Sequence, residues 1–347
     1  MANLFLTGAS GYIGGDILHL LAESRPEYRV RALIRDAAKA GAVKNAFGQV
    51  EVVNGSLDDI DLIAQDAQDA DVVLHLAATG HLKSVQAIHK ALADKPKGGK
   101  SPYWIQIGGG SVLAAAELAD KSRVSGTGSD TVFDNLAGIE AIRSLIKQHP
   151  SRAADNYMLS VAETTPHVKT AIVPAPMIYG QGRGPGNRRS VQIPELAKVT
   201  LERRRGLRLA RASAGGVEGD EDGRVWGSNE IYLAAAGEMS FGEISQRVTD
   251  RAYDLKLLPR RDVDQVGGEE ADKLLPHGSV LFGTNARGRP SREEAVLGWR
   301  PQEGPWSKRS LEWWLTKHGH FAFCEVKGHL RRSECWSAVL AVPIKGL

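Results

Sequence analysis

The residues with the clearest chemical purpose lie near the N-terminus, in Gly8-Ala9-Ser10-Gly11-Tyr12-Ile13-Gly14. They follow an expected strand over residues 3–7 and open an expected helix over 12–23. In such a unit Gly8 allows a tight turn, Gly11 lets a pyrophosphate approach the backbone, and Gly14 lets the helix pack closely on the sheet. The N-terminus of the helix offers N–H groups and a positive dipole to the phosphates. The residues expected to bind a dinucleotide here are Gly8, Ser10, Gly11, Tyr12, Ile13 and Gly14.

The choice of dinucleotide depends on the end of the next strand, where Arg35 stands 21 residues after Gly14 and Asp36 follows it. NAD sites usually carry an acidic residue there for the ribose 2′-hydroxyl, whereas NADP sites place an arginine near the 2′-phosphate. The guanidinium fork suits a phosphate. We therefore expect NADP and keep NAD as the alternative, with Asp36 on the ribose.

The elements that must hold these residues alternate along the first half of the chain. Helical patterns over 12–23, 59–67 and 81–93 separate the apolar runs expected to be strands, and alternation of this kind predicts a doubly wound, parallel-sheet α/β (Rossmann) fold. The expected strands are residues 3–7, 29–34, 49–53, 72–77, 103–107 and 169–173.

The character of the sequence changes after residue 180, where a glycine- and arginine-rich stretch begins. Beyond it we expect a smaller, mostly helical lobe. The expected division is a dinucleotide domain over 1–180, a substrate lobe over 181–317 and an unassigned tail over 318–347. The helices expected in the lobe cover residues 190–203, 240–253, 291–297 and 307–317.

Composition excludes several classes of protein. The chain has 347 residues and a net charge of +3, which leaves no electrostatic footprint for nucleic acid or an anionic membrane. It holds only two cysteines, Cys324 and Cys335, which excludes a disulfide framework. No apolar run approaches the roughly 18 residues that cross a bilayer, so a membrane-spanning helix is not expected. The histidines do not show metal-ligand spacing, so no metal site is expected. We expect a soluble, cytoplasmic protein.

Residues 7–14 also resemble the T-G-x-x-G-x-x-G loop of the short-chain dehydrogenase/reductase superfamily, in its extended or atypical branch. Further segments resemble that family in order. The resemblance covers about residues 3–315 and is closest to fungal NAD-dependent epimerase/dehydratase-like proteins, which shade into the NmrA-like group. The matching segments are Leu33-Ile34-Arg35-Asp36, Gly55-Ser56-Leu57-Asp58, His75-Leu76-Ala77-Ala78, Pro174-Ala175-Pro176-Met177-Ile178-Tyr179-Gly180 and Leu297-Gly298-Trp299-Arg300-Pro301.

The resemblance implies further site residues. It places Leu57, Ala77, Ala78, Pro174 and Met177 against the cofactor. It also implies substrate contacts at Tyr179 of the Tyr-Gly pair and at Arg292, shortly before Leu-Gly-Trp. A surface arginine at the start of a helix is the alternative for Arg292.

The catalytic residues of the family are incomplete here. Members use a Ser or Thr after the fifth strand, for which Ser111 is the match, and a Tyr-x-x-x-Lys pair. None of the seven tyrosines is followed four residues later by lysine. Tyr157 is nearest by region, but Val161 replaces the lysine. The alternatives are that Tyr157 packs on a helix face and that Ser111 caps a loop.

Two segments depart from the family. Between Leu207 and Tyr232 the expected V-H-V-x-D-L core is missing, and residues 321–347 match nothing in the family. We predict an NAD(P)-dependent oxidoreductase-like protein acting on a carbonyl, an alcohol or a sugar-nucleotide-like small molecule. The alternatives are a non-catalytic, NmrA-like dinucleotide sensor with a protein partner, and an inactive truncated isoform.

Overall fold

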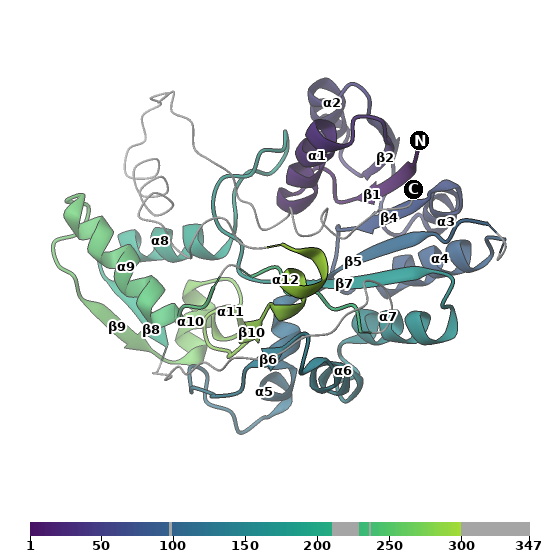
Figure 1. The fold of residues 1–347 in the computed structure, drawn as a ribbon. Helices are drawn as coiled ribbons and strands as arrows, with labels where there is room; N and C mark the ends of the chain where they lie inside the picture. The colour runs from purple at the N-terminus through teal and green to yellow at the C-terminus, as the bar shows by residue number, and fades with distance from the viewer. Residues whose placement is uncertain (97–98, 210–228, 236, 300–347) are drawn as a thin grey trace.

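The computed structural model describes residues 1–96, 99–209, 229–235 and 237–299. Its centre is a parallel six-stranded sheet in the order β3-β2-β1-β4-β5-β7 (Figure 1). The direction of winding reverses between β1 and β4, and ligands of such sheets bind at the carboxyl ends of the strands near this reversal. The strands are β1 (Asn3–Thr7), β2 (Arg29–Ile34), β3 (Glu51–Asn54), β4 (Val72–His75), β5 (Tyr103–Gly109) and β7 (Lys169–Ala175).

Side chains of the sheet alternate between two cores, as the two-residue period of a strand requires. In β1, Leu4 and Leu6 join the core under α1 (Tyr12–Ser24) and α2 (Ala37–Ala46). Phe5 joins the core on the other face. The helices that cover that second face are α3 (Ile60–Asp69), α4 (Leu82–Ala93), α6 (Ile139–Lys147) and α7 (Ala153–Thr164).

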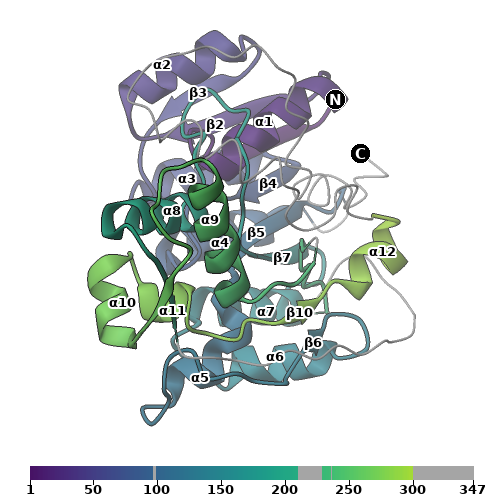
Figure 2. The ribbon, with the colours of Figure 1, turned by 90° about the vertical axis from the view of Figure 1, so that its left-hand side faces the viewer.

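A lobe with its own apolar core lies beside this unit in Figure 1 and faces the viewer in Figure 2. Two of its strands pair in parallel, β8 (Gly206–Leu209) with β9 (Val263–Val266). The expectation of a mostly helical lobe missed this two-stranded sheet, because each strand has only four residues and sits in a polar context. The helices of the lobe are α8 (Gln192–Arg203), α9 (Phe241–Asp254), α10 (Gly268–Leu274) and α11 (Gly278–Leu281).

The chain returns to the sheet after the lobe begins. Ile231 bridges Ile172 beside β7, and β10 (Gly288–Arg289) pairs with β6 (Phe133–Asp134). Segments after residue 180 thus pack on the first unit as well as on the lobe. The domain boundary at residue 180 stays a prediction. The remaining elements are η1 (Gly110–Ala114), α5 (Ala115–Ala119) and α12 (Ser291–Leu297).

The doubly wound fold is confirmed, and each expected strand has its counterpart. The helices expected over 12–23, 59–67, 81–93, 190–203, 240–253 and 291–297 are also present, whereas α2, α5, α6, α10 and α11 were not among the expected helices. The expected helix over 307–317, both cysteines and most of the segment 207–232 lie outside the described residues. Across the part of the chain that the structure describes, no helix is both long and apolar enough to span a bilayer.

Candidate functional site

The phosphate loop is built by close backbone contacts. Gly8 has φ +81°, and its carbonyl accepts the N–H of Gly11 at 2.8 Å. A Cβ on Gly14 would lie 2.2 Å from the Gly8 oxygen, and a Cβ on Gly8 would lie 2.9 Å from the backbone of Ala77. Gly14 is therefore required by the close approach of α1 to the loop, and Gly8 by its positive φ and its approach to the segment after β4.

Gly11 differs from these two glycines. It is the N-cap of α1, with no side chain to cap the helix. A Cβ there would approach only the Gly8 oxygen, at 3.1 Å. The N-terminus of α1 therefore faces a space, the phosphate-loop cavity, of about 310 Å³. The first wall of this cavity holds the predicted cofactor residues Gly8, Gly11, Tyr12, Ile13, Gly14 and Ala77.

The end of β2 presents two different side chains. Arg35 is exposed. Asp36 is the N-cap of α2, and its Oδ1 accepts the N–H of Lys39 at 2.9 Å. This backbone hydrogen bond is the main reason why the pKa of Asp36 lies below its ordinary value. The carboxylate of Asp36 is thus engaged with its own helix, while the Arg35 guanidinium is at the surface.

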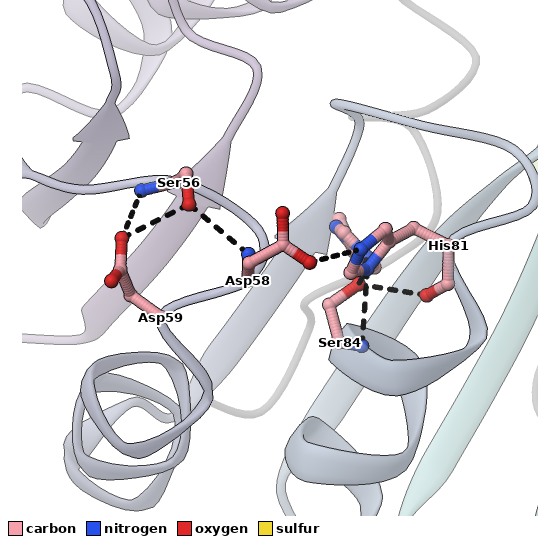
Figure 3. Close-up of polar contacts among 6 residues, drawn as sticks. Ser56, Asp58, Asp59, His81 and Ser84 are labelled. Carbon is pink, nitrogen blue, oxygen red and sulfur yellow. Dashed lines mark hydrogen bonds and ion pairs between the residues drawn. The ribbon is translucent and has the colours of Figure 1, made fainter.

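The loop that carries Leu57 is braced to the start of α4 (Figure 3). The Asp59 carboxylate accepts from Ser56 N–H at 2.6 Å and from Ser56 Oγ at 3.0 Å. Asp58 Oδ1 lies 3.3 Å from His81 Nε2, and His81 Nδ1 lies 3.0 Å from Ser84 Oγ. Ser56 organises this turn, since its Oγ also accepts the N–H of Asp58 at 3.2 Å. Leu57 itself packs on the second core.

A buried chain of hydrogen bonds fixes the end of β4. Thr7 Oγ1 accepts from the N–H groups of Leu76 (3.1 Å) and Ala77 (3.2 Å). Its own proton is therefore directed to His75 Nδ1, at 2.6 Å, which leaves His75 Nε2–H to donate to Ser84 Oγ at 2.8 Å. Burial lowers the pKa of His75 to about 3, so the ring is neutral at pH 7.

Ala77 and Ala78 follow this chain and line a second space, the middle cavity, of about 620 Å³. It shares Ile13 and Ala77 with the phosphate-loop cavity. It shares Ala175 with a third space, the large cavity, of about 1200 Å³. Pro176 and Gln192 line both the phosphate-loop cavity and the large cavity. The three cavities therefore adjoin one another at the carboxyl edge of the sheet, where a dinucleotide binds in such folds.

The large cavity lies between the sheet and the lobe. The sheet and the segments that follow its strands contribute Ser111 of η1 and three positions expected from the resemblance, which are Pro174 within β7 and Met177 and Tyr179 after it. Many of the remaining lining side chains are apolar and come from the lobe or the segments that return from it. Among them are Leu209, Leu233, Met239, Phe241, Leu281 and Phe282.

Ser111 is paired with a cation that the sequence analysis missed. Arg152 Nη2 donates to Ser111 Oγ at 3.0 Å and to the Ser111 carbonyl. Burial lowers the pKa of Arg152 and raises that of Asp155, one turn further along α7, to about 6. The only sequence signal for Arg152 is its place at the start of the helix before β7, because 41 residues separate it from Ser111.

Tyr157 lies elsewhere. Its hydroxyl is 2.8 Å from His89 Nδ1, and the two rings pack edge to face at 5.5 Å. Tyr157 packs on the second core, and burial raises its pKa. None of the three cavities is lined by it. These contacts favour the packing alternative over a catalytic role.

Arg292 is also differently placed from either expectation. It is 4% exposed, so it is not a surface arginine. Its Nε donates to Glu230 Oε2 at 2.8 Å, and its guanidinium lies 5.8 Å from the centre of the Tyr232 ring. It does not line the large cavity. The buried ion pair favours a structural role for Arg292, joining α12 to the segment that returns to β7.

Comparison with known proteins agrees with this geometry. A family model described as NAD(P)H-binding matches residues 8–156. The chain is 31% identical over 335 residues to the oxidase ucsJ of an Acremonium species, covering 89% of this chain and 95% of the relative.

Solved structures show the same fold at low identity. A dTDP-glucose 4,6-dehydratase of Streptomyces venezuelae, with NAD bound, has a TM-score of 0.59 and 16% identity over 91% of this chain and 97% of its own. The NAD complex of the Bacillus anthracis dTDP-glucose 4,6-dehydratase has a TM-score of 0.58 and 14% identity, over 92% of this chain and 97% of its own.

Fold, phosphate loop and relatives together define an NAD(P)-binding, oxidoreductase-like Rossmann protein. More closely, the chain belongs to the family of the oxidase ucsJ, and its NAD(P)H-binding region and its fold agree with the resemblance to short-chain dehydrogenase/reductases. The resemblance inferred from the motifs is confirmed.

Proposed function

We propose that this protein is an NADP(H)-dependent oxidoreductase that acts on a carbonyl or alcohol group of a bulky, largely apolar small molecule. The observation that carries the proposal is the continuity of the three cavities. Gly11 lies at one end and Ser111 at the other. Shared lining residues connect the intervening space, so a dinucleotide laid along it would bring its nicotinamide towards Ser111.

The preference for NADP rests on the end of β2. Arg35 and Lys39 are exposed beside the N-terminus of α2. Both cations and the helix dipole favour a 2′-phosphate. Asp36, the residue that would accept a ribose hydroxyl in an NAD site, already accepts the Lys39 N–H.

Ser111 and Arg152 supply the polar chemistry of the proposed reaction. Because Arg152 Nη2 donates to Ser111 Oγ, the serine proton is left to point at a substrate oxygen. The positive charge of Arg152 makes that hydroxyl a better donor to oxygen as negative charge develops there. A reduced nicotinamide would supply the hydride. The proton that completes the alcohol comes from the solvent, while Ser111 acts as a hydrogen-bond donor to the developing oxyanion rather than as the acid.

The lining of the large cavity favours an apolar substrate over a sugar nucleotide. Its described charged residues are two arginines, Arg208 and Arg287, and two glutamates, Glu238 and Glu243. Arg287 Nε donates to Glu238 at 2.7 Å. The charges therefore balance, while Met239, Phe241 and Phe282 offer apolar surface. A sugar diphosphate would need a surplus of cations.

The test is single-turnover oxidation of NADPH with a panel of apolar ketones and aldehydes. Ser111→Ala should lower the rate by about 10²–10³-fold, which is typical of one lost oxyanion donor. NADPH affinity should stay unchanged. Ser160→Ala removes an exposed hydroxyl from α7 and is the matched control.

Wild-type turnover should itself be slow, because the chain lacks the Tyr-x-x-x-Lys pair and general acid–base catalysis is worth about 10²–10⁴-fold in rate. NADPH binding without oxidation by any compound of the panel would contradict the enzymatic proposal. That result would favour the dinucleotide-sensing regulator.

A further inference from the structure

A hairpin of residues 180–190 follows β7 and lies on the phosphate loop. Gln181 and Arg189 form its antiparallel bridge, and Gly182 N–H donates to the Arg188 carbonyl at 3.0 Å. The hairpin meets the loop through its backbone, because Asn187 N–H donates to the Ser10 carbonyl at 3.0 Å. The glycine- and arginine-rich sequence of this segment thus forms part of the cofactor half of the molecule.

Two glycines of the hairpin make this contact possible. A Cβ on Gly186 would lie 2.2 Å from the Ser10 oxygen. A Cβ on Gly184 would lie 2.5 Å from the Cα of Gly15, in the first turns of α1. The hairpin therefore packs on the loop and on α1 through backbone contacts, at distances that only glycine permits.

A buried ion pair fixes the hairpin to α1. Asp16 is 1% exposed. It accepts three hydrogen bonds from Arg183, from Nε at 2.7 Å, from Nη2 at 2.8 Å and from the backbone N–H at 3.2 Å. Such a bidentate pair fixes geometry as well as charge. The hairpin is held in one position relative to the N-terminus of α1.

This placement gives the phosphate-loop cavity a second wall. Asn187, Arg189, Ser190 and Gln192 line it together with the glycines of the loop. Ser190 is 3% exposed, and its Oγ has no hydrogen-bond partner among the described residues. Buried hydroxyls are almost always paired, so an unpaired one beside a cavity points to a missing ligand. Arg189 brings positive charge to the same wall and also contacts Glu195 at 2.7 Å.

We propose that the hairpin completes the dinucleotide site, with Ser190 and Arg189 binding the pyrophosphate from the side opposite Gly11. The ligand class is a diphosphate diester, and the inference rests on the dinucleotide binding proposed above. Because Gln192 begins α8 and also lines the large cavity, the same contact joins the cofactor to the lobe.

The first test is Ser190→Ala, measured by titration with NADPH, ADP-ribose and 2′-AMP. Loss of one hydrogen bond to a charged group should weaken NADPH and ADP-ribose about tenfold or more. Binding of 2′-AMP, which has no pyrophosphate, should not change. The melting temperature of the ligand-free protein should not fall, because the hydroxyl has no partner to lose. Ser160→Ala is the matched control.

A second variant tests the seat of the hairpin. Gly186→Ala should weaken NADPH more than Ser190→Ala does, because its Cβ would push the hairpin off Ser10. Gly48→Ala is its control, since a Cβ there meets nothing within 4 Å.

The outcomes separate the inference from the proposed function. Unchanged NADPH and ADP-ribose affinity in Ser190→Ala overturns the inference and leaves the dinucleotide site intact. Equal weakening of 2′-AMP would also overturn it, since the effect would then not concern the pyrophosphate. Failure of the wild-type protein to bind any of the three ligands would instead defeat the proposed function.

Discussion

The phosphate loop and the surroundings of Ser111 are held together by different kinds of contact. Around the phosphate loop, contacts are between backbone atoms, and Gly8 and Gly14 are required because a Cβ would collide with the chain. Around Ser111, the side chains come from distant segments: Arg152, the N-cap of α7, donates to Ser111, and Phe241 of α9 lines the same cavity. Backbone chemistry leaves a fixed spacing of glycines in the sequence. Side-chain chemistry can be replaced from another part of the fold, and the sequence keeps no local trace of it.

The absent Tyr-x-x-x-Lys pair illustrates this difference. Ser111, the residue matched to the family serine by the resemblance, lies in η1 shortly after β5. Its cationic neighbour is Arg152, and the tyrosine nearest in sequence, Tyr157, points to His89 instead. The phosphate loop therefore keeps the family pattern in its sequence, while the surroundings of Ser111 are apparent only in the three-dimensional structure.

The largest expected effect comes from the phosphate loop. Gly11→Val should abolish NADPH binding, because the branched side chain would occupy the space where the pyrophosphate approaches the helix. The fold should survive, since the only close neighbour of a Cβ there is the Gly8 oxygen. Titration by intrinsic fluorescence, together with a melting curve, measures both quantities.

Gly14→Ala is the contrasting variant. Its Cβ would lie 2.2 Å from the Gly8 oxygen, so the protein itself should lose about 1–3 kcal/mol of stability. Gly41→Ala, with nothing within 4 Å, is the control. If Gly11→Val and Gly14→Ala lower stability equally, the distinction between ligand space and packing is wrong.

The second effect tests the adenosine end. Arg35→Ala should weaken NADPH by about 10–150-fold, the equivalent of roughly 1.5–3 kcal/mol for a charge-assisted contact. NADH should change little, because it lacks the 2′-phosphate. Parallel titrations measure the ratio. Equal weakening of both cofactors would mean that Arg35 contacts the adenine rather than the phosphate.

The third effect concerns His75 and its buried hydrogen bonds at the end of β4. The unfolded chain protonates His75 near pH 6.5, whereas burial holds the pKa of the folded form at about 3. Unfolded molecules therefore bind more protons between these values, and stability is lost as the pH falls below 6.5. At pH 5 the loss should be about 2 kcal/mol relative to pH 7.

Urea unfolding at several pH values of wild type and His75→Gln isolates this contribution. The variant should show a flatter pH dependence, whatever its absolute stability. His19→Gln changes a partly exposed histidine of α1 and serves as the control. An unchanged slope in His75→Gln would show that His75 is not the group that titrates.

The smallest effect is expected at Tyr157. Tyr157→Phe should leave single-turnover NADPH oxidation within about threefold of wild type, because the hydroxyl contacts His89 and lies outside the cavities. General acid–base catalysis by this tyrosine would instead be worth about 10²–10⁴-fold. A drop above tenfold would mean that the catalytic end has kept the family tyrosine after all.

Much of the fold could be predicted because its signals are local. Buried strands such as Val72–His75 read as apolar runs, and the helices between them carry a repeating apolar face. The short strand Gly206–Leu209 could not be predicted, since its pairing with Val263–Val266 depends on residues far along the chain. Arg292 was placed by its neighbourhood in sequence, but its partner Glu230 lies 62 residues away.

The sequence alone determined the class of protein, the phosphate loop and the residues at the end of β2, because glycine spacing and strand–helix alternation are properties of neighbouring residues. The tertiary structure alone decided which side chains meet. It brought Arg152 to Ser111, turned Tyr157 towards His89, and folded residues 180–190 back on the loop at Ser10. These contacts join segments separated by tens of residues or more, and packing of the whole chain, rather than local propensity, selects them.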